Sequence, residues 1–354
     1  MMTVKPLTRN TISDAEAVIK DRFPGESLNV FKSVMTNPLL AECEEAGDIV
    51  YEDGEPICFR AAILRNMYLG QKKIRGRVRG FTCIKKGASA EAIIEVQQAA
   101  RKNKRGCSIA FSNSQCRETE KMARIMRAKL GPESCTRFLC RFVRPLQCLL
   151  YLIRRRVFKL SIPNWPIFDS LGIEYKKSCK NSISVMRVMN DVTFFNKLDE
   201  SIRTANKGVI CARTHTDVNW LFGGRIDSGR IVVLGAFREG NPIGYVAIDG
   251  GDNGKRWMVV DWVAVNNDEN TLDVLLECAV EFVRYYTPCI LLECIGFEQR
   301  IQHLLKKYFR GTRKFGCNIF SYNVVDKQLQ SEFDCAFKGE CSWFFGPYDG
   351  DSSM

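Results

Sequence analysis

The feature that most constrains the fold of this chain is an internal repeat. The segments DGEPICF (53–59) and EGNPIGY (239–245) each place a turn between two strand-like stretches, and a strand, a helix and a buried strand follow both of them. The same order of elements therefore occurs twice, at the spacing of a unit of about 130–150 residues. The repeat predicts two similar units rather than one continuous domain.

The order of hydrophobic and polar residues predicts the elements of each half. The first half has strands at 4–7, 48–52, 57–69, 75–84, 107–111 and 136–146, and helices at 13–22 and 89–104, with a basic helix running to Gly131. The second half has strands at 231–237, 243–249, 257–265, 289–295 and 316–324, and helices at 193–205, 271–286 and 298–309. We divide the chain into an N-terminal unit (1–145), a linker helix (146–170), a C-terminal unit (171–330) and an aromatic, Asp-containing strand and tail (331–354).

The charge of the chain is concentrated in one half. Up to Leu160 there are 30 basic and 16 acidic residues, a net charge of +14, whereas the remainder has 22 and 24, a net charge of −2. All five tryptophans lie after Leu160. A basic half suits nucleic acid, an anionic membrane or a phosphorylated ligand, and charge alone does not choose among them.

The cysteine pattern predicts free buried thiols rather than disulfides or a metal site. The 16 cysteines include no C-x-x-C pair, and the only histidines are His215 and His303. We therefore expect no metal. The N-terminal MMTVKPLTRN does not have the pattern of a targeting segment, so we expect a cytoplasmic protein whose thiols stay reduced.

The apolar run LQCLLYLI (146–153) is far shorter than the roughly 20 residues that cross a bilayer. Arg154, Arg155 and Arg156 follow it directly. One interpretation is a linker helix packed between two domains. The other is a basic amphipathic helix over 146–160 that contacts an anionic membrane surface peripherally, at its inner face.

Two segments of the first half carry a family resemblance. GFTCIKKGASAEAIIEV (80–96) and IAFSNSQCRETEKMARIMRAKLG (109–131) resemble the strand, acyl-CoA loop and helices of the GCN5-related N-acetyltransferases. The whole chain resembles a tandem pair of such units, as in bacterial two-unit N-acyltransferases of cell-surface polysaccharide synthesis. This resemblance implies an α/β (α+β) fold with two units, each a mixed, mostly antiparallel sheet flanked by helices.

The loop before the helix at 89–104 suits a phosphorylated cofactor. A helix N-terminus carries unpaired N–H groups and partial positive charge, so a Gly-containing loop ahead of it can hold a pyrophosphate. The resemblance places the pantetheine arm between two diverging strands. The predicted binding residues for acetyl-CoA or another acyl-CoA are Thr82, Cys83, Ile84, Lys85, Lys86, Gly87, Ala88, Ser89 and Asn113. In the second half the corresponding stretch contains Asp268, Glu269 and Asp273, which repel phosphate, so we assign the cofactor to the first half.

Catalytic residues are harder to assign. The tyrosine acid that the family often has is replaced by Met126 and Arg127 in the first half, and the corresponding position in the second half is near Leu305. We expect Asp261, a carboxylate inside the apolar strand WMVVDWVAV, to be the base, with Glu293 as a second candidate. The alternative is that Asp261 lies on an exposed face or pairs with an arginine.

The C-terminal segment contains aromatic residues followed by carboxylates, which suits a sugar or amino-sugar acceptor. The predicted substrate-binding residues are Trp262, Trp343, Asp349 and Asp351. The alternative is an edge strand that docks the tail.

These features predict an acyl-CoA-dependent N-acyltransferase that acts on an amine, such as an amino sugar. One rival is a catalytically silent, ligand-binding tandem unit. Another is an aminoacyl-tRNA-dependent peptidyl transferase of similar build, with the basic half as an RNA surface. We rank nucleic acid lower as a partner because no basic strand interleaved with aromatic residues is present.

Overall fold

A computed structural model describes most of the chain. Its described residues are 1–22, 34–42, 45–114, 128–130, 137–156, 170–251, 254–296, 302–313, 319–338 and 343–344. The predicted basic helix that runs to Gly131 lies mostly outside this part, as do Asp349 and Asp351.

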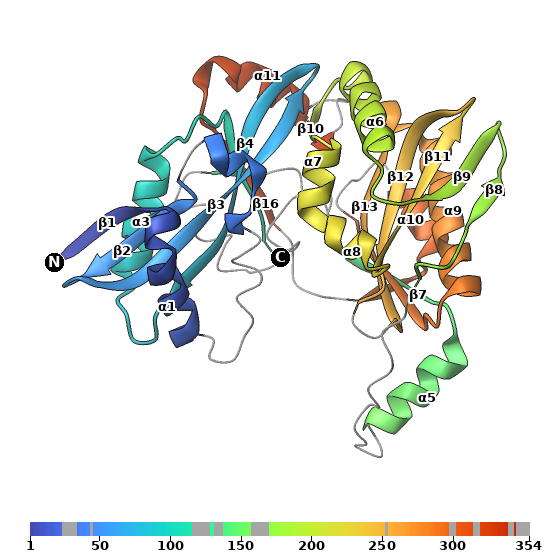
Figure 1. Ribbon diagram of the computed structural model, residues 1–354, viewed down its shortest axis with the longest axis horizontal. Coiled ribbons are helices and arrows are strands. Elements are labelled where there is room, and N and C mark those ends of the chain that lie inside the picture. Colours follow the sequence, from blue (N-terminus) through green and yellow to red (C-terminus); the bar gives the residue numbers. More distant parts are fainter. Residues whose placement is uncertain are drawn as a thin grey trace.

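Two sheets lie side by side (Figure 1). The strands of the first sheet, in spatial order, are β1 (Met2–Leu7), β2 (Gly47–Glu52), β3 (Glu55–Leu69), β4 (Lys72–Ile84), β5 (Ile109–Ser114), β16 (Ile319–Val324) and β6 (Lys129–Leu130). Two further strands join it through β3: β10 (Val209–Cys211) pairs with β3, and β17 (Trp343–Phe344) pairs with β10.

The second sheet repeats this pattern. Its strands, in spatial order, are β15 (Gly311–Arg313), β7 (Arg137–Phe142), β14 (Leu291–Gly296), β13 (Arg256–Ala264), β12 (Asn241–Asp249), β11 (Ile231–Arg238), β9 (Ile183–Val188) and β8 (Lys176–Ser178). In both sheets the pairing is antiparallel except for β4 with β5, β13 with β14, and β10 with β17. The predicted α/β class with two mixed sheets is confirmed.

Helices cover the sheets. The helices in the described part of the chain are α1 (Ile12–Arg22), α3 (Glu91–Lys102), α5 (Pro145–Arg156), α6 (Val192–Ala205), α7 (His215–Val218), α8 (Gly224–Asp227), α9 (Glu269–Tyr286), α10 (Gln302–Tyr308) and α11 (Gln330–Lys338), and all but α5 lie against a sheet. Neighbouring residues of β3 point to opposite faces of the first sheet, so Phe59 packs with Val18 of α1, and Cys58 packs with Val96 of α3. On the second sheet, Phe195 of α6 packs edge-on against Tyr245, and Phe282 of α9 packs against Trp257.

The repeated turn has the same conformation in both halves. Asp53 and Gly54 have φ of 49° and 89°, and Glu239 and Gly240 have φ of 52° and 77°. A two-residue hairpin loop of this type requires positive φ at both central residues. Glycine adopts this conformation without strain. Both hairpins have a bulge at the same distance from the turn, at Val50/Tyr51 in one and at Ala236/Phe237 in the other. The predicted internal repeat is confirmed.

The two halves exchange a strand. β7 belongs to the first half of the sequence but pairs with β14, and β16 belongs to the second half but pairs with β5. The contiguous units 1–145 and 171–330 therefore do not correspond to the two sheets. The sequence could not show this, because the buried pattern of a strand does not identify its partner.

Further contacts join the halves. β10 pairs antiparallel with the end of β3, the hydroxyl of Tyr68 donates to Asp199 Oδ2 at 2.5 Å, and the side chain of Asn206 donates to the Gly70 carbonyl at 2.7 Å. Tyr68 is also part of the core cluster of the second sheet. The two sheets are thus one packed structure.

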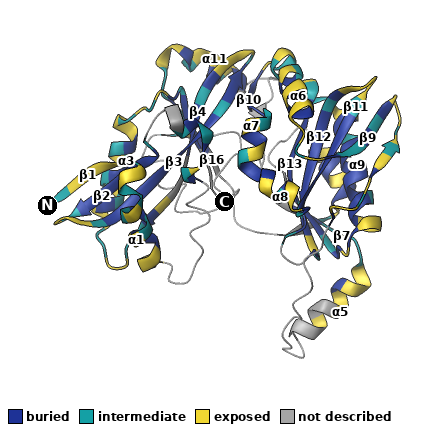
Figure 2. Cartoon of the chain, in the orientation of Figure 1, coloured by how far each residue is buried: buried dark blue, intermediate teal, exposed yellow. Residues whose placement is uncertain are grey.

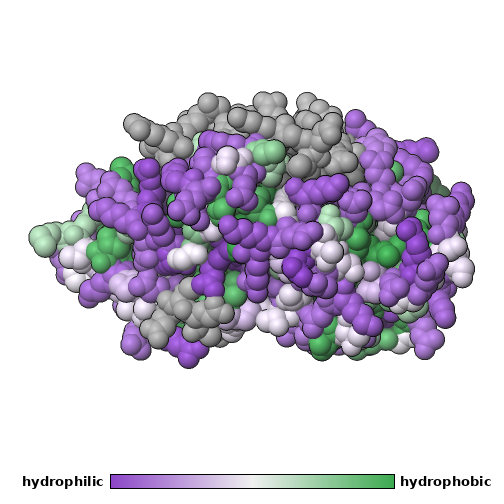
Figure 3. Space-filling view, turned by 90° about the horizontal axis from the view of Figure 1, so that it is seen from above, coloured by the Kyte–Doolittle hydropathy of each residue, from purple (hydrophilic) through white to green (hydrophobic). Residues whose placement is uncertain are grey.

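The surface is mostly polar, with α5 as an exception. The face seen in Figure 3 is largely hydrophilic, and the strands of both sheets are mainly buried in Figure 2. α5 projects from the second sheet and exposes the stripe Leu146, Leu149, Leu150 and Ile153. No helix of the described chain is long and apolar enough to cross a membrane.

Candidate active site

The first sheet opens between β4 and β5. These strands pair only from Gly76–Ile109 to Val78–Phe111, although β4 continues to Ile84 and β5 continues to Ser114. A bulge in the β3–β4 pairing, between Arg60 and Ala62, accompanies this divergence. The end of β4 therefore has a backbone edge to which an extended ligand can bind as an added strand.

The loop Lys85–Ser89 connects this edge to α3. Gly87 has φ +77°, and a Cβ there would meet nothing within 4 Å, so the loop is open to solvent. The backbone N–H of Lys86 donates to Asp21 Oδ2 at 2.8 Å, and that of Glu91 donates to Ser89 Oγ at 3.1 Å. The amide of Lys86 is thus occupied by a carboxylate of the chain, which a phosphate bound at this amide would have to displace.

The predicted cofactor residues belong to β4, β5 and the loop that follows β4. Thr82 is exposed, Ile84 is half-buried, and Cys83 is buried against α1, where its thiol donates to the Val18 carbonyl at 3.9 Å. Burial raises the pKa of Cys83 and keeps it a neutral thiol. Asn113 lies on β5 opposite Phe320 of β16, and its side chain lies outside the described part.

The second sheet has an equivalent opening. β13 and β14 pair from Arg256–Leu291 to Val259–Cys294, and β13 then continues to Ala264. The bulge in the β12–β13 pairing lies next to Asp261, and the repeat aligns Trp262, the partner of Val246, with Thr82, the partner of Arg60. The two sites can therefore be compared residue by residue.

Asp261 is fully buried and held by two side chains. Arg213 Nε donates to Asp261 Oδ2 at 2.8 Å, Arg213 Nη2 donates to Oδ1 at 3.1 Å, and the Tyr245 hydroxyl donates to Oδ2. A bidentate arginine is among the strongest partners of a carboxylate. The structure thus has the arginine pairing that the sequence left open as the alternative to a free base.

Arg213 extends this network to the first sheet. Its backbone N–H donates to Asp199 Oδ1 at 2.6 Å, and the other oxygen of Asp199 accepts the hydroxyl of Tyr68 on β3. Burial raises the pKa values of Asp199 and Tyr68. Nothing in the sequence around Arg213 indicates this role, because its partner is distant in the chain.

Glu293 is also buried and ion-paired. It lies on β14, is 1% exposed, and accepts from Arg256 Nε of the adjacent strand β13. The two carboxylates expected as bases are therefore both held by arginines.

Two acids before and within α9 are bound by neighbouring side chains. Asp268 caps α9 by accepting from the N–H and hydroxyl of Thr271 at 3.2 and 2.6 Å. Asp273 accepts from Lys307 at 2.7 Å and from the Tyr308 hydroxyl at 2.8 Å. The N-terminus of α9 is occupied by a carboxylate of the chain itself, which agrees with the assignment of phosphate binding to the first half.

Of the predicted acceptor residues, only Trp262 has a described side chain. Trp262 is 1% exposed and belongs to the core of the second sheet. Trp343 lies on β17, which pairs in parallel with β10, as expected for a docked tail strand. Asp349 and Asp351 lie outside the described residues. In the described ranges no group of His, Cys, Asp or Glu side chains could hold a metal ion.

No protein-family model and no curated protein matches the chain. Solved structures do match it. A GCN5-related N-acetyltransferase from Kribbella flavida is 11% identical with a TM-score of 0.60, over 92% of this chain and 71% of that one. A probable N-acyltransferase from Enterococcus faecalis is 10% identical with a TM-score of 0.61, over 94% and 74%. Saccharomyces cerevisiae N-myristoyltransferase with bound myristoyl-CoA is 11% identical with a TM-score of 0.51, over 91% and 77%. At these identities the similarity shows the fold, which is that of tandem N-acyltransferase-like units.

Proposed function

We propose that this protein is an acyl-CoA-dependent N-acyltransferase that binds acyl-CoA in its first half. The observation that supports this most is the opening between β4 and β5, which leads directly into the Gly87 loop and the N-terminus of α3. The fold adds support, since one of the similar structures contains a bound acyl-CoA.

The proposed binding mode uses the backbone of the chain. The pyrophosphate binds at the loop Lys85–Ser89, where Lys86 and Gly87 are exposed. The pantetheine arm then lies along Thr82–Ile84 and hydrogen-bonds to the free edge of β4. The thioester would reach the point where β4 and β5 separate, near Val78 and Phe111.

The proposed reaction is direct attack of an amine on the thioester. A C–N bond forms, the C–S bond breaks, the amine loses a proton, and the leaving thiolate of CoA gains one. Because Asp261 and Glu293 are buried in ion pairs, we assign them to the framework and a water chain to the proton transfer. We further propose an amino sugar as the acceptor, on the basis of the aromatic and acidic residues of 341–351.

Calorimetry with acetyl-CoA, longer acyl-CoAs and free CoA tests the proposal. We expect binding that Lys86→Glu weakens at least tenfold, because the new carboxylate repels the pyrophosphate. The matched control is Lys72→Glu, an exposed lysine at the other end of β4, which should retain the affinity. If no acyl-CoA binds the wild-type chain, the proposed function is wrong.

A binding-only tandem unit is the second candidate, and the ion pairing of both expected bases favours it. Release of free CoA in the presence of amine acceptors separates the two. An enzyme produces CoA thiol in proportion to acylated amine, whereas a binding module holds acyl-CoA without turnover.

A further inference from the structure

A basic pocket lies on the α3 side of the first sheet, over the paired parts of β4 and β5 and next to the opening between them. Its volume is about 430 Å³. It is formed by the last turns of α3, parts of β3, β4, β5 and β6, the end of β16 and the segment that follows β16. Six of its lining residues are basic: Arg60, Arg77, Arg101, Lys104, Lys129 and Lys327.

The two arginines of this pocket are buried. Arg60 and Arg77 are 7% and 6% exposed, whereas Arg101, Lys104 and Lys327 are exposed. Arg77 Nη1 donates to the Asn103 carbonyl at 2.8 Å, and burial lowers the pKa of Arg77. A buried guanidinium is stabilised by an anion, and its planar array of donors fits phosphate oxygens.

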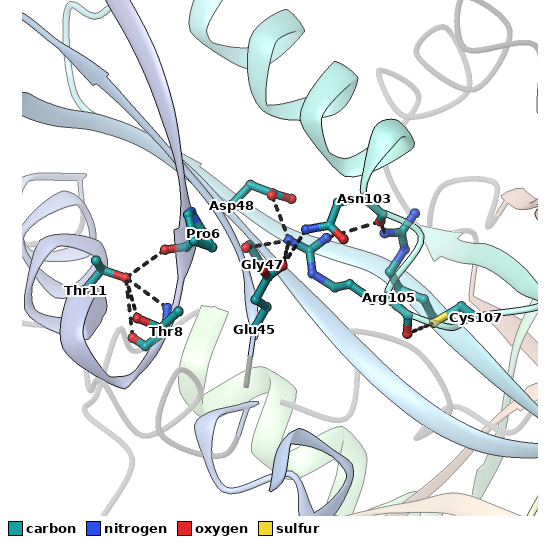
Figure 4. A network of polar contacts seen from close by, with 10 residues as sticks. Pro6, Thr8, Thr11, Glu45, Gly47, Asp48, Asn103, Arg105 and Cys107 are labelled. Carbon is teal, nitrogen blue, oxygen red and sulfur yellow. Dashed lines mark hydrogen bonds and ion pairs between the residues drawn. The ribbon is translucent and has the colours of Figure 1, made fainter. Parts of the chain in front are cut away.

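Arg105 binds two carboxylates close to this pocket, Asp48 and Glu45, and Asp48 also interacts electrostatically with Arg77 (Figure 4). Arg105 Nη2 contacts Asp48 Oδ1 at 2.7 Å and Glu45 Oε2 at 3.5 Å, and it donates to the Gly47 carbonyl at 2.6 Å. Asn103 also donates to Glu45. Among the described residues that line the pocket there is no Asp or Glu, although Asp334 pairs with Lys129 at 2.6 Å. Positive charge in a recess of this kind concentrates anions.

We propose that this pocket binds a small anion that carries two or more phosphate groups. Its volume lies in the range of small-molecule sites, and its buried arginines with surrounding lysines supply more cations than a single phosphate needs. The pocket differs from the proposed acyl-CoA loop, which precedes α3, whereas the pocket uses the last turns of α3. The two ends of this 12-residue helix are separated by roughly 16 Å.

The exchanged strand is essential for this pocket. Lys327 follows β16, which comes from the second half, whereas Arg60, Arg77 and Lys104 come from the first. A bound polyphosphate would therefore connect the two halves and stabilise the folded chain as a whole.

Calorimetry of the full chain with tripolyphosphate, pyrophosphate and inorganic phosphate, in about 0.15 M salt, tests this proposal. We expect affinity to rise with the number of phosphates. The variant Lys104→Glu/Lys327→Glu changes two exposed residues and should weaken tripolyphosphate binding at least tenfold. The control Lys72→Glu/Lys73→Glu makes the same change in charge on β4 outside the pocket and should weaken it less than twofold. Equal losses in both variants, or no binding of tripolyphosphate, would overturn the proposal.

A competition experiment separates the pocket from the acyl-CoA loop. We expect tripolyphosphate to bind Lys86→Glu with wild-type affinity and to bind in the presence of saturating CoA. If CoA displaces it and Lys86→Glu abolishes its binding, the anion occupies the cofactor loop and the pocket is not a separate site. Conversely, if the chain binds tripolyphosphate but no acyl-CoA, the pocket proposal is supported and the proposed function is wrong.

Discussion

The openings of the two sheets have similar strand geometry, but the side chains next to them differ in exposure and charge. In the first, the residue next to the bulge is the exposed Thr82, and a loop with two lysines and Gly87 follows. In the second, the residue next to the bulge is Asp261, one position before the equivalent of Thr82, and it is buried with Arg213. One copy of the repeat keeps an accessible, basic edge, whereas the other uses the same place to hold the two sheets together. Duplication thus allows one copy to bind a ligand and the other to stabilise the structure.

Removing Asp261 should give the largest effect. In Asp261→Ala the guanidinium of Arg213 remains buried without its carboxylate, which costs about 3–5 kcal/mol. The measurement is the free energy of unfolding in urea. The comparison variant at the opening of the first sheet is Thr82→Ala, which should stay within about 0.5 kcal/mol of wild type because Thr82 is exposed. Equal unfolding curves for the two variants would show that the two openings do not differ in this way.

Asp261→Asn distinguishes a framework role from a catalytic one. If Asp261 acts through the fold, acyl transfer by this variant falls only with the fraction of folded protein, and acyl-CoA affinity is retained. A loss of turnover in fully folded protein, with a changed pH profile, would restore Asp261 as the base that the sequence suggested.

Gly87 should be the next most sensitive position. Its φ of +77° is strained for a branched side chain, so Gly87→Val should distort the loop and weaken acyl-CoA binding about tenfold. Gly240, at the repeated hairpin turn, has the same φ and also no atom near an added Cβ. Gly240→Val should therefore lower stability to a similar extent while acyl-CoA affinity is unchanged. A loss of affinity in both variants would mean that the loop has no special role.

The stability of the protein at alkaline pH tests the hydrogen bond between Tyr308 and Asp273. Burial raises the pKa of Tyr308 to about 12, and its hydroxyl donates to Asp273. Because the unfolded tyrosine loses its proton near its ordinary pKa of 10 while the folded one keeps it, stability falls as the pH rises from about 10 to 12. The free energy of unfolding of Tyr308→Phe should fall less steeply with pH than that of wild type. The control Tyr285→Phe, at an exposed tyrosine, should follow the wild-type curve. Parallel curves for all three proteins would contradict the Asp273 pairing.

The smallest effect is expected at α5. We propose that its exposed stripe and basic surroundings allow peripheral contact with anionic lipid, and a single short helix binds such a surface only weakly. Leu146→Ser/Leu150→Ser should reduce sedimentation with anionic vesicles severalfold, without a change in the unfolding midpoint. Gln147→Ser, at an exposed position between them, is the control. Equal sedimentation of the two variants would favour a linker helix with no membrane contact.

The sequence predicts those parts of the fold that depend on local pattern. The hairpin turns at Asp53-Gly54 and Glu239-Gly240, the helices α1 and α9, and the loop before α3 all follow from residue type and spacing. The exchange of β7 and β16 does not, because both strands have the same kind of pattern and pairing is decided by the whole chain.

The site is less accessible to prediction than the fold. The sequence identifies Asp261 as unusual but not its partner Arg213, which lies 48 residues away. The pocket around Arg77 and Lys327 has no sequence signal at all, because its residues come from distant segments. Long-range contacts of this kind carry no local periodicity.

The strand exchange also determines when the chain can finish folding. During synthesis the first sheet lacks β16 until almost the whole chain has been made, so β5 remains an open edge for most of that time. Pairing over such long sequence separations is slow. A fragment that ends after the first half would keep this edge exposed and be prone to aggregate, and the chain therefore becomes a stable protein only when its last strands arrive.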